Sequence, residues 1–253
     1  MKPSFLNSNK PLLCVMIQED NPKDAIDLIQ NCRFDGAEAF GIQLECLKRE
    51  YRNETDLKTI FNACGGLPIY VTSYRNYAST GYTDQDCMDY LKLAAKCGAT
   101  LCDVMADTFD IQKEGTTFDQ NAVSKQKQVI NELHALGAEV LMSTHFTDFK
   151  DKEYTYNIAR AQSERGCDVI KIVNFAHNDE QLVKNLEICV GLKEVSNAKY
   201  LYLASGEKGK FIRQTGGGLG ACMYLCVYRY GGVYFLQQPV LKSQKLIRDN
   251  MVL

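Results

Sequence analysis

Short apolar segments alternate with amphipathic segments along nearly the whole chain. Short apolar runs bounded by turn residues are typical of buried strands, and apolar residues at helical spacing are typical of helices that cover a sheet. Strands are predicted at residues 12–17, 36–40, 68–73, 100–105, 139–143, 168–173 and 200–204, with a last one between residues 222 and 235. The clearest helices are predicted at residues 22–31, 84–97, 121–136, 153–165 and 179–192.

This alternation restricts the fold class. Strands that alternate with helices form a parallel sheet with both faces covered. About eight such units in 253 residues predict an α/β protein with the (β/α)8 TIM-barrel architecture, in a single domain that spans residues 1–253. An open, doubly wound sheet is the alternative.

The charge balance and the hydropathy argue against nucleic-acid and membrane partners. The chain has 29 lysines and arginines against 31 acidic residues, which gives a net charge of −2. No basic run is interleaved with aromatic residues, and no apolar run approaches the roughly 18 residues of a membrane span. The first residues, MKPSFLNSNKP, lack the apolar core of a signal peptide. We therefore expect a small-molecule partner and a cytoplasmic location.

Eleven cysteines are spread along the chain without a CxxC motif. The most closely spaced pair, Cys222 and Cys226, has no second ligand pair beside it. Without a secretory signal, reduced thiols are expected rather than disulfides or a metal site. Neither a metal nor an organic cofactor is predicted. A homodimer is compatible with the sequence, although no feature demands it.

A lysine interrupts the apolar segment CDVIKIV at residues 167–173. Side chains alternate along a strand, so Val169, Lys171 and Val173 share one face. An isolated ammonium group buried against the helices would be costly, whereas the inside of a barrel near its carboxyl-terminal mouth is where active sites gather. An amine that loses its proton there can attack a carbonyl and form a Schiff base. The alternative is a structural lysine whose ammonium reaches the solvent.

The preceding segment, EVLMSTHFTDF, places His145 at the end of the fifth predicted strand. Adjacent strands lie roughly 4.8 Å apart, so this imidazole and Lys171 could converge. An imidazole beside an imine can act as a general base and then as a general acid. A hydrogen-bonded structural role is the alternative for His145.

The segment ASGEKGKFIR at residues 204–213 follows the seventh predicted strand. A glycine-rich turn that leads into a helix presents backbone N–H groups, and Arg213 adds a guanidinium that can bind a carboxylate with two hydrogen bonds.

Taken together, these segments resemble the type I 3-dehydroquinate dehydratases over most of the chain. The family motif S-x-H-D-F is similar to STHFTDF and implies that His145 is catalytic, and D-I-x-K-I-A is similar to CDVIKIV and implies that Lys171 forms the imine. The M-G-x-x-G-x-x-S-R turn is similar to SGEKGKFIR and implies a substrate-binding role for Arg213. The E-W-R strand is similar to EAF, which implies that Glu38 binds substrate.

The chain departs from the family motifs at several positions. The arginine of E-W-R is Phe40, and the T-x-R strand end reads TSYR, which displaces Arg75 by one residue. The glutamate of D-x-E, which supports the catalytic histidine in the family, is Met105, with Asp103 or Asp107 as alternatives. The late S-A-P-G-Q lid is replaced by FLQQPV, where Gln237 or Gln238 could take the polar role; our prediction names Gln238.

The resemblance implies a cofactor-independent dehydratase that converts 3-dehydroquinate to 3-dehydroshikimate and water in the shikimate pathway of aromatic amino acid biosynthesis, or that acts on a related hydroxylated keto acid. Three alternatives remain open at this point. One is a class I aldolase that breaks a C–C bond through the same imine. Another is an inactive ligand-binding barrel. The third is a metal-dependent sugar isomerase that uses Glu38, His145, Asp168 and His177.

Overall fold

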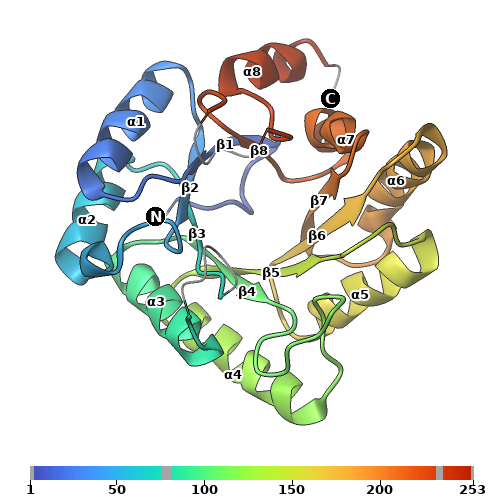
Figure 1. The fold of residues 1–253 in the computed structure, drawn as a ribbon, viewed down its shortest axis with the longest axis horizontal. Coiled ribbons are helices and arrows are strands. Elements are labelled where there is room, and N and C mark those ends of the chain that lie inside the picture. Colours follow the sequence, from blue (N-terminus) through green and yellow to red (C-terminus); the bar gives the residue numbers. More distant parts are fainter. Residues whose placement is uncertain (1–2, 76–80, 232–235, 252–253) are drawn as a thin grey trace.

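In the part of the chain that the structure describes, eight parallel strands form a ring and eight α-helices surround it (Figure 1). The structure is a computed structural model that describes residues 3–75, 81–231 and 236–251. The strands are β1 (Leu12–Ile17), β2 (Ala39–Gln43), β3 (Ile69–Thr72), β4 (Leu101–Met105), β5 (Glu139–His145), β6 (Val169–Phe175), β7 (Lys199–Ser205) and β8 (Met223–Cys226). The helices are α1 (Pro22–Phe34), α2 (Glu54–Ala63), α3 (Asp84–Cys97), α4 (Gln120–Ala135), α5 (Lys152–Glu164), α6 (Asp179–Gly191), α7 (Gly209–Thr215) and α8 (Leu241–Asp249). Short 3-10 helices lie at Arg49–Tyr51, Leu192–Glu194 and Gly216–Leu219.

The strand order confirms the predicted barrel. The strands follow the order β7-β6-β5-β4-β3-β2-β1-β8, so the first strand pairs with both the second and the last. Between β7 and β8, the backbone N–H of Cys222 donates to the carbonyl of Tyr200 at 2.8 Å. The sheet is therefore a nearly closed (β/α)8 barrel, and the open doubly wound alternative is wrong. Residues 232–235, at the end of the last predicted strand segment, lie outside the described residues.

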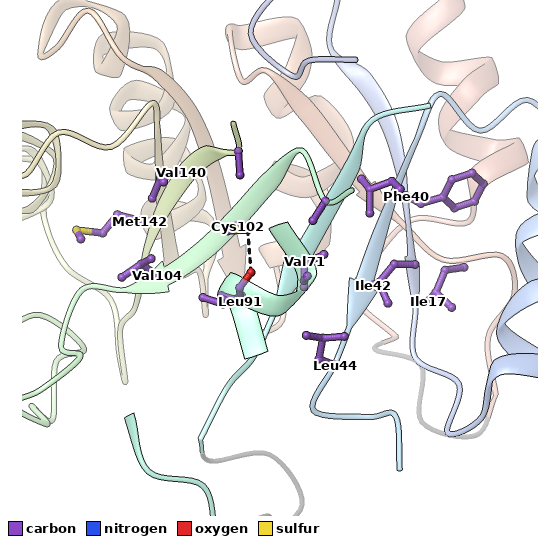
Figure 2. Close-up of a cluster of buried hydrophobic side chains, with 14 of the residues drawn as sticks. Ile17, Phe40, Ile42, Leu44, Val71, Leu91, Cys102, Val104, Val140 and Met142 are labelled. Atoms are coloured by element: carbon purple, nitrogen blue, oxygen red, sulfur yellow. Dashed lines mark hydrogen bonds between the residues drawn. The ribbon is translucent and has the colours of Figure 1, made fainter. Parts of the chain in front are cut away.

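Side-chain alternation divides the barrel into two apolar cores. The outer core fills the space between the strands and the helices, and Figure 2 shows part of it, including Phe40, Ile42 and Leu91. The inner core fills the ring and includes Val169 and Val173 of β6. Because Ile170 and Ile172 belong to the outer core, the predicted face of Lys171 is confirmed: it points into the ring.

The second strand differs most from its prediction, since β2 begins three residues later than expected. Its centre is Gly41, where an added Cβ would overlap the thioether of Met16 inside the ring. A glycine therefore makes room for a large inner side chain of the neighbouring strand. A glycine within a strand is also a weak sequence signal, and the misplaced strand affects the prediction that Glu38 binds substrate.

Polar side chains fix the starts of most helices. Asn21, Asn53, Thr83, Asp119 and Asn178 each accept a hydrogen bond from the backbone N–H three residues further on. Such caps satisfy N–H groups that have no partner within the helix. They hold the helices around the ring and so keep the strand ends, which carry the site, in place.

The amino-terminal segment closes one end of the ring. Phe5 is buried with the inner core, and its backbone N–H donates to Oε2 of Glu139 at the start of β5, at 3.0 Å. The opposite end of the ring, where the strands finish, carries the candidate site. Among the described residues, no helix is long and apolar enough to cross a membrane. The eleven cysteines all lie within the described residues, and none of them forms a disulfide bond.

Candidate active site

A cavity of about 330 Å³ lies at the carboxyl ends of the strands. This is the end at which active sites of (β/α)8 barrels are built. Its lining includes two cations, three glutamines, one imidazole and a group of apolar side chains. The lining residues are Met16, Gln18, Gln43, Thr72, Tyr74, His145, Phe146, Lys171, Val173, Phe175, Leu203, Ser205, Arg213, Leu225 and Gln238.

Lys171 lies at the base of the cavity and is 4% exposed. Its Nζ is within hydrogen-bonding distance of three oxygens: the Tyr74 hydroxyl at 2.6 Å, the Tyr70 hydroxyl at 3.0 Å and Oδ2 of Asp103 at 3.0 Å. An ammonium group has three protons to donate, so these partners satisfy a charged lysine. The lysine is thus paired in the resting protein, and its amine must lose a proton before it can act as a nucleophile.

Asp103 is the buried counter-ion of this group. Its side chain is inaccessible to solvent, and Oδ2 also accepts hydrogen bonds from Tyr74 at 2.6 Å and from Tyr70. Burial alone would raise the pKa of Asp103, but the Lys171 ammonium and the neighbouring hydroxyls hold it below its ordinary value. Burial and the Asp103 charge raise the pKa of both tyrosines well above 10, so both hydroxyls keep their protons.

His145 lies at the end of β5, where its neighbour on β6 is Val173. Its ring lines the cavity and meets the Tyr74 ring edge to face, with the centroids 5.4 Å apart. The His145 side chain is exposed at the mouth of the barrel, yet the protein atoms around its ring, followed by the positive charges of Lys171 and Arg213, lower the pKa of His145 to about 3. The ring is therefore neutral near pH 7. No hydrogen bond to the ring is formed among the described residues, so it is free to accept a proton.

Arg213 projects from α7 into the cavity and is 5% exposed. Its Nε donates to the Ala204 carbonyl at 2.8 Å, and burial lowers its pKa to about 10. The first residue of α7 is Gly209, where an added Cβ would overlap the same carbonyl. This close approach of helix and strand brings the guanidinium to the mouth of the barrel. Gln238, from the segment before α8, also lines the cavity.

The structure does not bring Glu38 to this cavity, which corrects the prediction that it binds substrate. Glu38 precedes β2 and therefore lies at the opposite end of the barrel. Its carboxylate accepts hydrogen bonds from Arg248, from Lys10 at 2.8 Å and from the backbone N–H of Leu13 at 3.2 Å. Phe40 likewise packs in the outer core and faces no substrate.

The carboxyl end of β2 instead carries Gln43 and Glu45. Gln43 lines the cavity and donates to Glu45 at 3.0 Å. Glu45 is 3% exposed and also accepts a hydrogen bond from Thr72 at 2.8 Å. Burial raises the pKa of Glu45. Neither position supplies the positive charge that an arginine would.

Arg75 also fails to reach the cavity, so its predicted substrate-binding role is corrected. The guanidinium forms buried ion pairs with Asp84, at 2.7 Å, and with Asp107. It therefore ties the end of β3 to α3 and to the loop after β4. The displacement by one residue noted in the sequence turns Arg75 away from the mouth and places Tyr74 there instead.

The residues of the metal-dependent alternative do not converge. Asp168 lies at the start of β6 and contacts His134 at 2.8 Å, while His177 contacts Asp148 at 3.0 Å. In residues 3–75, 81–231 and 236–251, no group of three or more histidine, cysteine, aspartate or glutamate side chains could hold a metal ion.

Two tyrosines are the main site residues that sequence reasoning missed. In the segment PIYVTSY, residues 70, 72 and 74 share one face if the strand pattern continues to the mouth. Because Thr72 and Tyr74 line the cavity and Tyr70 is fully buried inside the ring, this alternation was the available signal.

Replacement of Glu38 by alanine tests the correction at β2. The free energy of unfolding is expected to fall by about 2 kcal/mol, because the buried Arg248 guanidinium loses a charged hydrogen-bond partner. Urea unfolding measures this loss, and Glu54→Ala is a matched control whose partner, Lys58, is exposed. The chemical reactivity of Lys171 towards carbonyl compounds should stay unchanged. A large loss of that reactivity would show that Glu38 does contribute to the active site.

The fold and the cavity define a (β/α)8 barrel in which a buried lysine, a histidine and an arginine line one cavity at the carboxyl-terminal mouth. The chain belongs to the type I 3-dehydroquinase family, whose family model matches residues 13–228. This confirms the family that the sequence motifs indicated. Membership implies a hydro-lyase that acts on a small-molecule keto acid.

Solved structures with the same fold include members of this family. The 3-dehydroquinate dehydratase of Geobacillus kaustophilus HTA426 has a TM-score of 0.80 at 12% identity, covering 96% of this chain and 92% of that one. The type I enzyme of Clostridium difficile, solved with covalently modified comenic acid, has a TM-score of 0.80 at 16% identity, with coverages of 96% and 93%. The Enterococcus faecalis enzyme has a TM-score of 0.76 at 13% identity and covers 98% of each chain. No curated protein matches the sequence.

Proposed function

We propose that this protein is a dehydratase that forms an imine between Lys171 and a small hydroxylated keto acid, with 3-dehydroquinate as the first candidate substrate. The observation that carries the proposal is the position of the Lys171 amine. It lies at the base of a cavity of about 330 Å³, with His145 and Arg213 on the same lining. A bound ketone would therefore meet a nucleophile, a base and a carboxylate-binding group in one cavity.

The charges of the cavity favour a substrate with a carboxylate. Lys171 and Arg213 are the cations of the described lining, and the lining includes no carboxylate. If Lys171 engages the ketone, Arg213 remains for the carboxylate, which it can hold with charge-assisted hydrogen bonds. Gln18, Gln43 and Gln238 can bond to substrate hydroxyls. We assign Gln238 to this role.

The chemical steps follow from these positions. Lys171 attacks the ketone carbon, and loss of water leaves a protonated imine that withdraws electrons from the adjacent carbon. His145, which is neutral, removes a proton from that carbon. The electron pair of the C–H bond moves towards the imine and then expels the β-hydroxyl, which takes a proton from His145 and leaves as water. Hydrolysis of the imine releases the product and restores the lysine.

Borohydride reduction in the presence of 3-dehydroquinate tests this proposal. Reduction should fix the imine as a stable secondary amine, and intact-mass and peptide analysis should locate the adduct on Lys171. Product analysis should find 3-dehydroshikimate without C–C cleavage products, which separates dehydration from an aldolase reaction. Absence of an adduct at Lys171 with 3-dehydroquinate and with a panel of other keto acids would contradict the proposal.

A further inference from the structure

Imine formation at Lys171 requires more proton transfers than His145 can serve. The lysine must lose a proton before attack, and the substrate oxygen must gain two protons to leave as water. Among the described residues, His145 forms no hydrogen bond to Lys171, whose amine bonds to Tyr70, Tyr74 and Asp103. The His145 ring is also the group needed later as the base. A second proton carrier close to Lys171 is therefore required.

We propose that Tyr74 is a catalytic residue that relays protons between Lys171, Asp103 and the departing carbonyl oxygen of the substrate. Its hydroxyl is 2.6 Å from Nζ of Lys171 and 2.6 Å from Oδ2 of Asp103. Tyr74 also lines the cavity, and we therefore place its hydroxyl beside the carbonyl that Lys171 would attack. The inference deepens the proposed function and rests on its imine step.

Tyr70 has the same two partners but a different position. Its hydroxyl is 3.0 Å from Nζ of Lys171 and bonds to Asp103, yet the residue is fully buried and absent from the cavity lining. Tyr70 can support the lysine and the carboxylate but cannot reach the substrate oxygen. A comparison of Tyr70 with Tyr74 therefore distinguishes a proton relay from simple support of the ion pair between Lys171 and Asp103.

Lys171, Tyr74 and Asp103 can together carry every proton that moves during imine formation. The Lys171 ammonium passes one proton to Asp103, and the neutral amine forms the C–N bond. Tyr74 protonates the resulting alkoxide and regains its proton from Asp103. The carbinolamine nitrogen then passes its second proton to Asp103 through Tyr74, and this proton reaches the hydroxyl as the C–O bond breaks. Water and a protonated imine result, with Asp103 ionised again and no outside reactant.

The test measures the rate at which Lys171 forms an imine with two carbonyl probes, propanal and 3-dehydroquinate. Saturating cyanoborohydride traps each imine, and peptide mass analysis follows modification at Lys171 alone. Tyr74→Phe is expected to slow modification by about 100-fold with either probe, because general acid–base help is lost. Tyr70→Phe, the matched control, should slow it far less. Circular dichroism and thermal unfolding check that both variants fold.

A second readout distinguishes proton relay from support. In Tyr74→Phe, small buffer acids should carry the missing protons, so the rate should rise with buffer concentration at constant pH and ionic strength. The unchanged protein should show little such dependence. This comparison decides the question even if Tyr70→Phe does not fold.

Each remaining outcome is decisive. Equal slowing by the two phenylalanine substitutions, or a Tyr74→Phe rate that is normal or independent of buffer, would overturn the relay. Modification of Lys171 by propanal but not by 3-dehydroquinate would show that 3-dehydroquinate is not the substrate. The propanal rates of the two variants would still test the relay. Absence of modification at Lys171 with both probes would overturn the relay together with the imine chemistry.

Discussion

A Lys171→Met variant is expected to show no trapped adduct and a loss of dehydration activity of at least about 10⁴-fold. The proposed reaction passes through a covalent bond to this amine, and removal of a covalent nucleophile typically removes almost all turnover. Trapping with borohydride and measurement of kcat check the two parts separately. Lys199→Met is the matched control, because Lys199 begins the neighbouring strand β7 at the opposite end of the barrel.

Methionine also leaves Asp103 buried without its cation, which by itself destabilises a protein. Lys171→Arg avoids this difficulty. The guanidinium keeps a positive charge beside Asp103, yet it stays protonated and cannot form an imine. A folded Lys171→Arg protein should therefore be as inactive as Lys171→Met. Turnover in a folded Lys171→Arg protein would contradict covalent catalysis.

A His145→Gln variant is expected to lower kcat by about 10²- to 10⁴-fold while the imine at Lys171 still forms. The reason is that His145 is assigned to removal of the carbon-bound proton, a step that follows imine formation. Trapping should consequently find the adduct in this variant, whereas formation of the dehydrated product should be slow. Loss of the adduct together with turnover would place His145 in the earlier step instead.

The pH profile adds a check on the same histidine. Its pKa is lowered to about 3, and the neutral ring is the active form, so the base remains available at every pH above that value. The rate constant kcat/KM should show no decline with a midpoint near the ordinary histidine value of roughly 6.5 between pH 8 and pH 5. A decline at that midpoint that disappears in His145→Gln would mean that the ring is charged in this range.

The fold and part of the site followed from local sequence. The strand–helix rhythm predicted the barrel, and strand alternation placed Lys171 inside the ring. His145 and Arg213 reached the same cavity because each follows an apolar segment at the end where parallel strands finish. These features depend on short-range sequence patterns, which can be recognised without knowledge of tertiary contacts.

The errors trace to register and to long-range pairing. Glu38 was assigned to the site because EAF resembles the family motif E-W-R, but β2 begins three residues later than predicted and Glu38 precedes it. Gly41 made the true strand difficult to recognise in the sequence. Its role, which is to leave space for the Met16 side chain, becomes clear only in the folded structure. The pairing of Asp103 with Lys171 joins residues 68 positions apart, and no local pattern predicts it.

Because Phe5 closes one end of the barrel, it limits how small molecules can enter and leave the ring. The described amino-terminal segment stops the end opposite the cavity, so the inner core offers no second passage there. In the proposed reaction, substrate, eliminated water and product would therefore all pass through the mouth at the strand ends. A molecule bound between Arg213 and Lys171 would therefore block both arrival and departure, and the order in which product and water leave becomes part of each turnover.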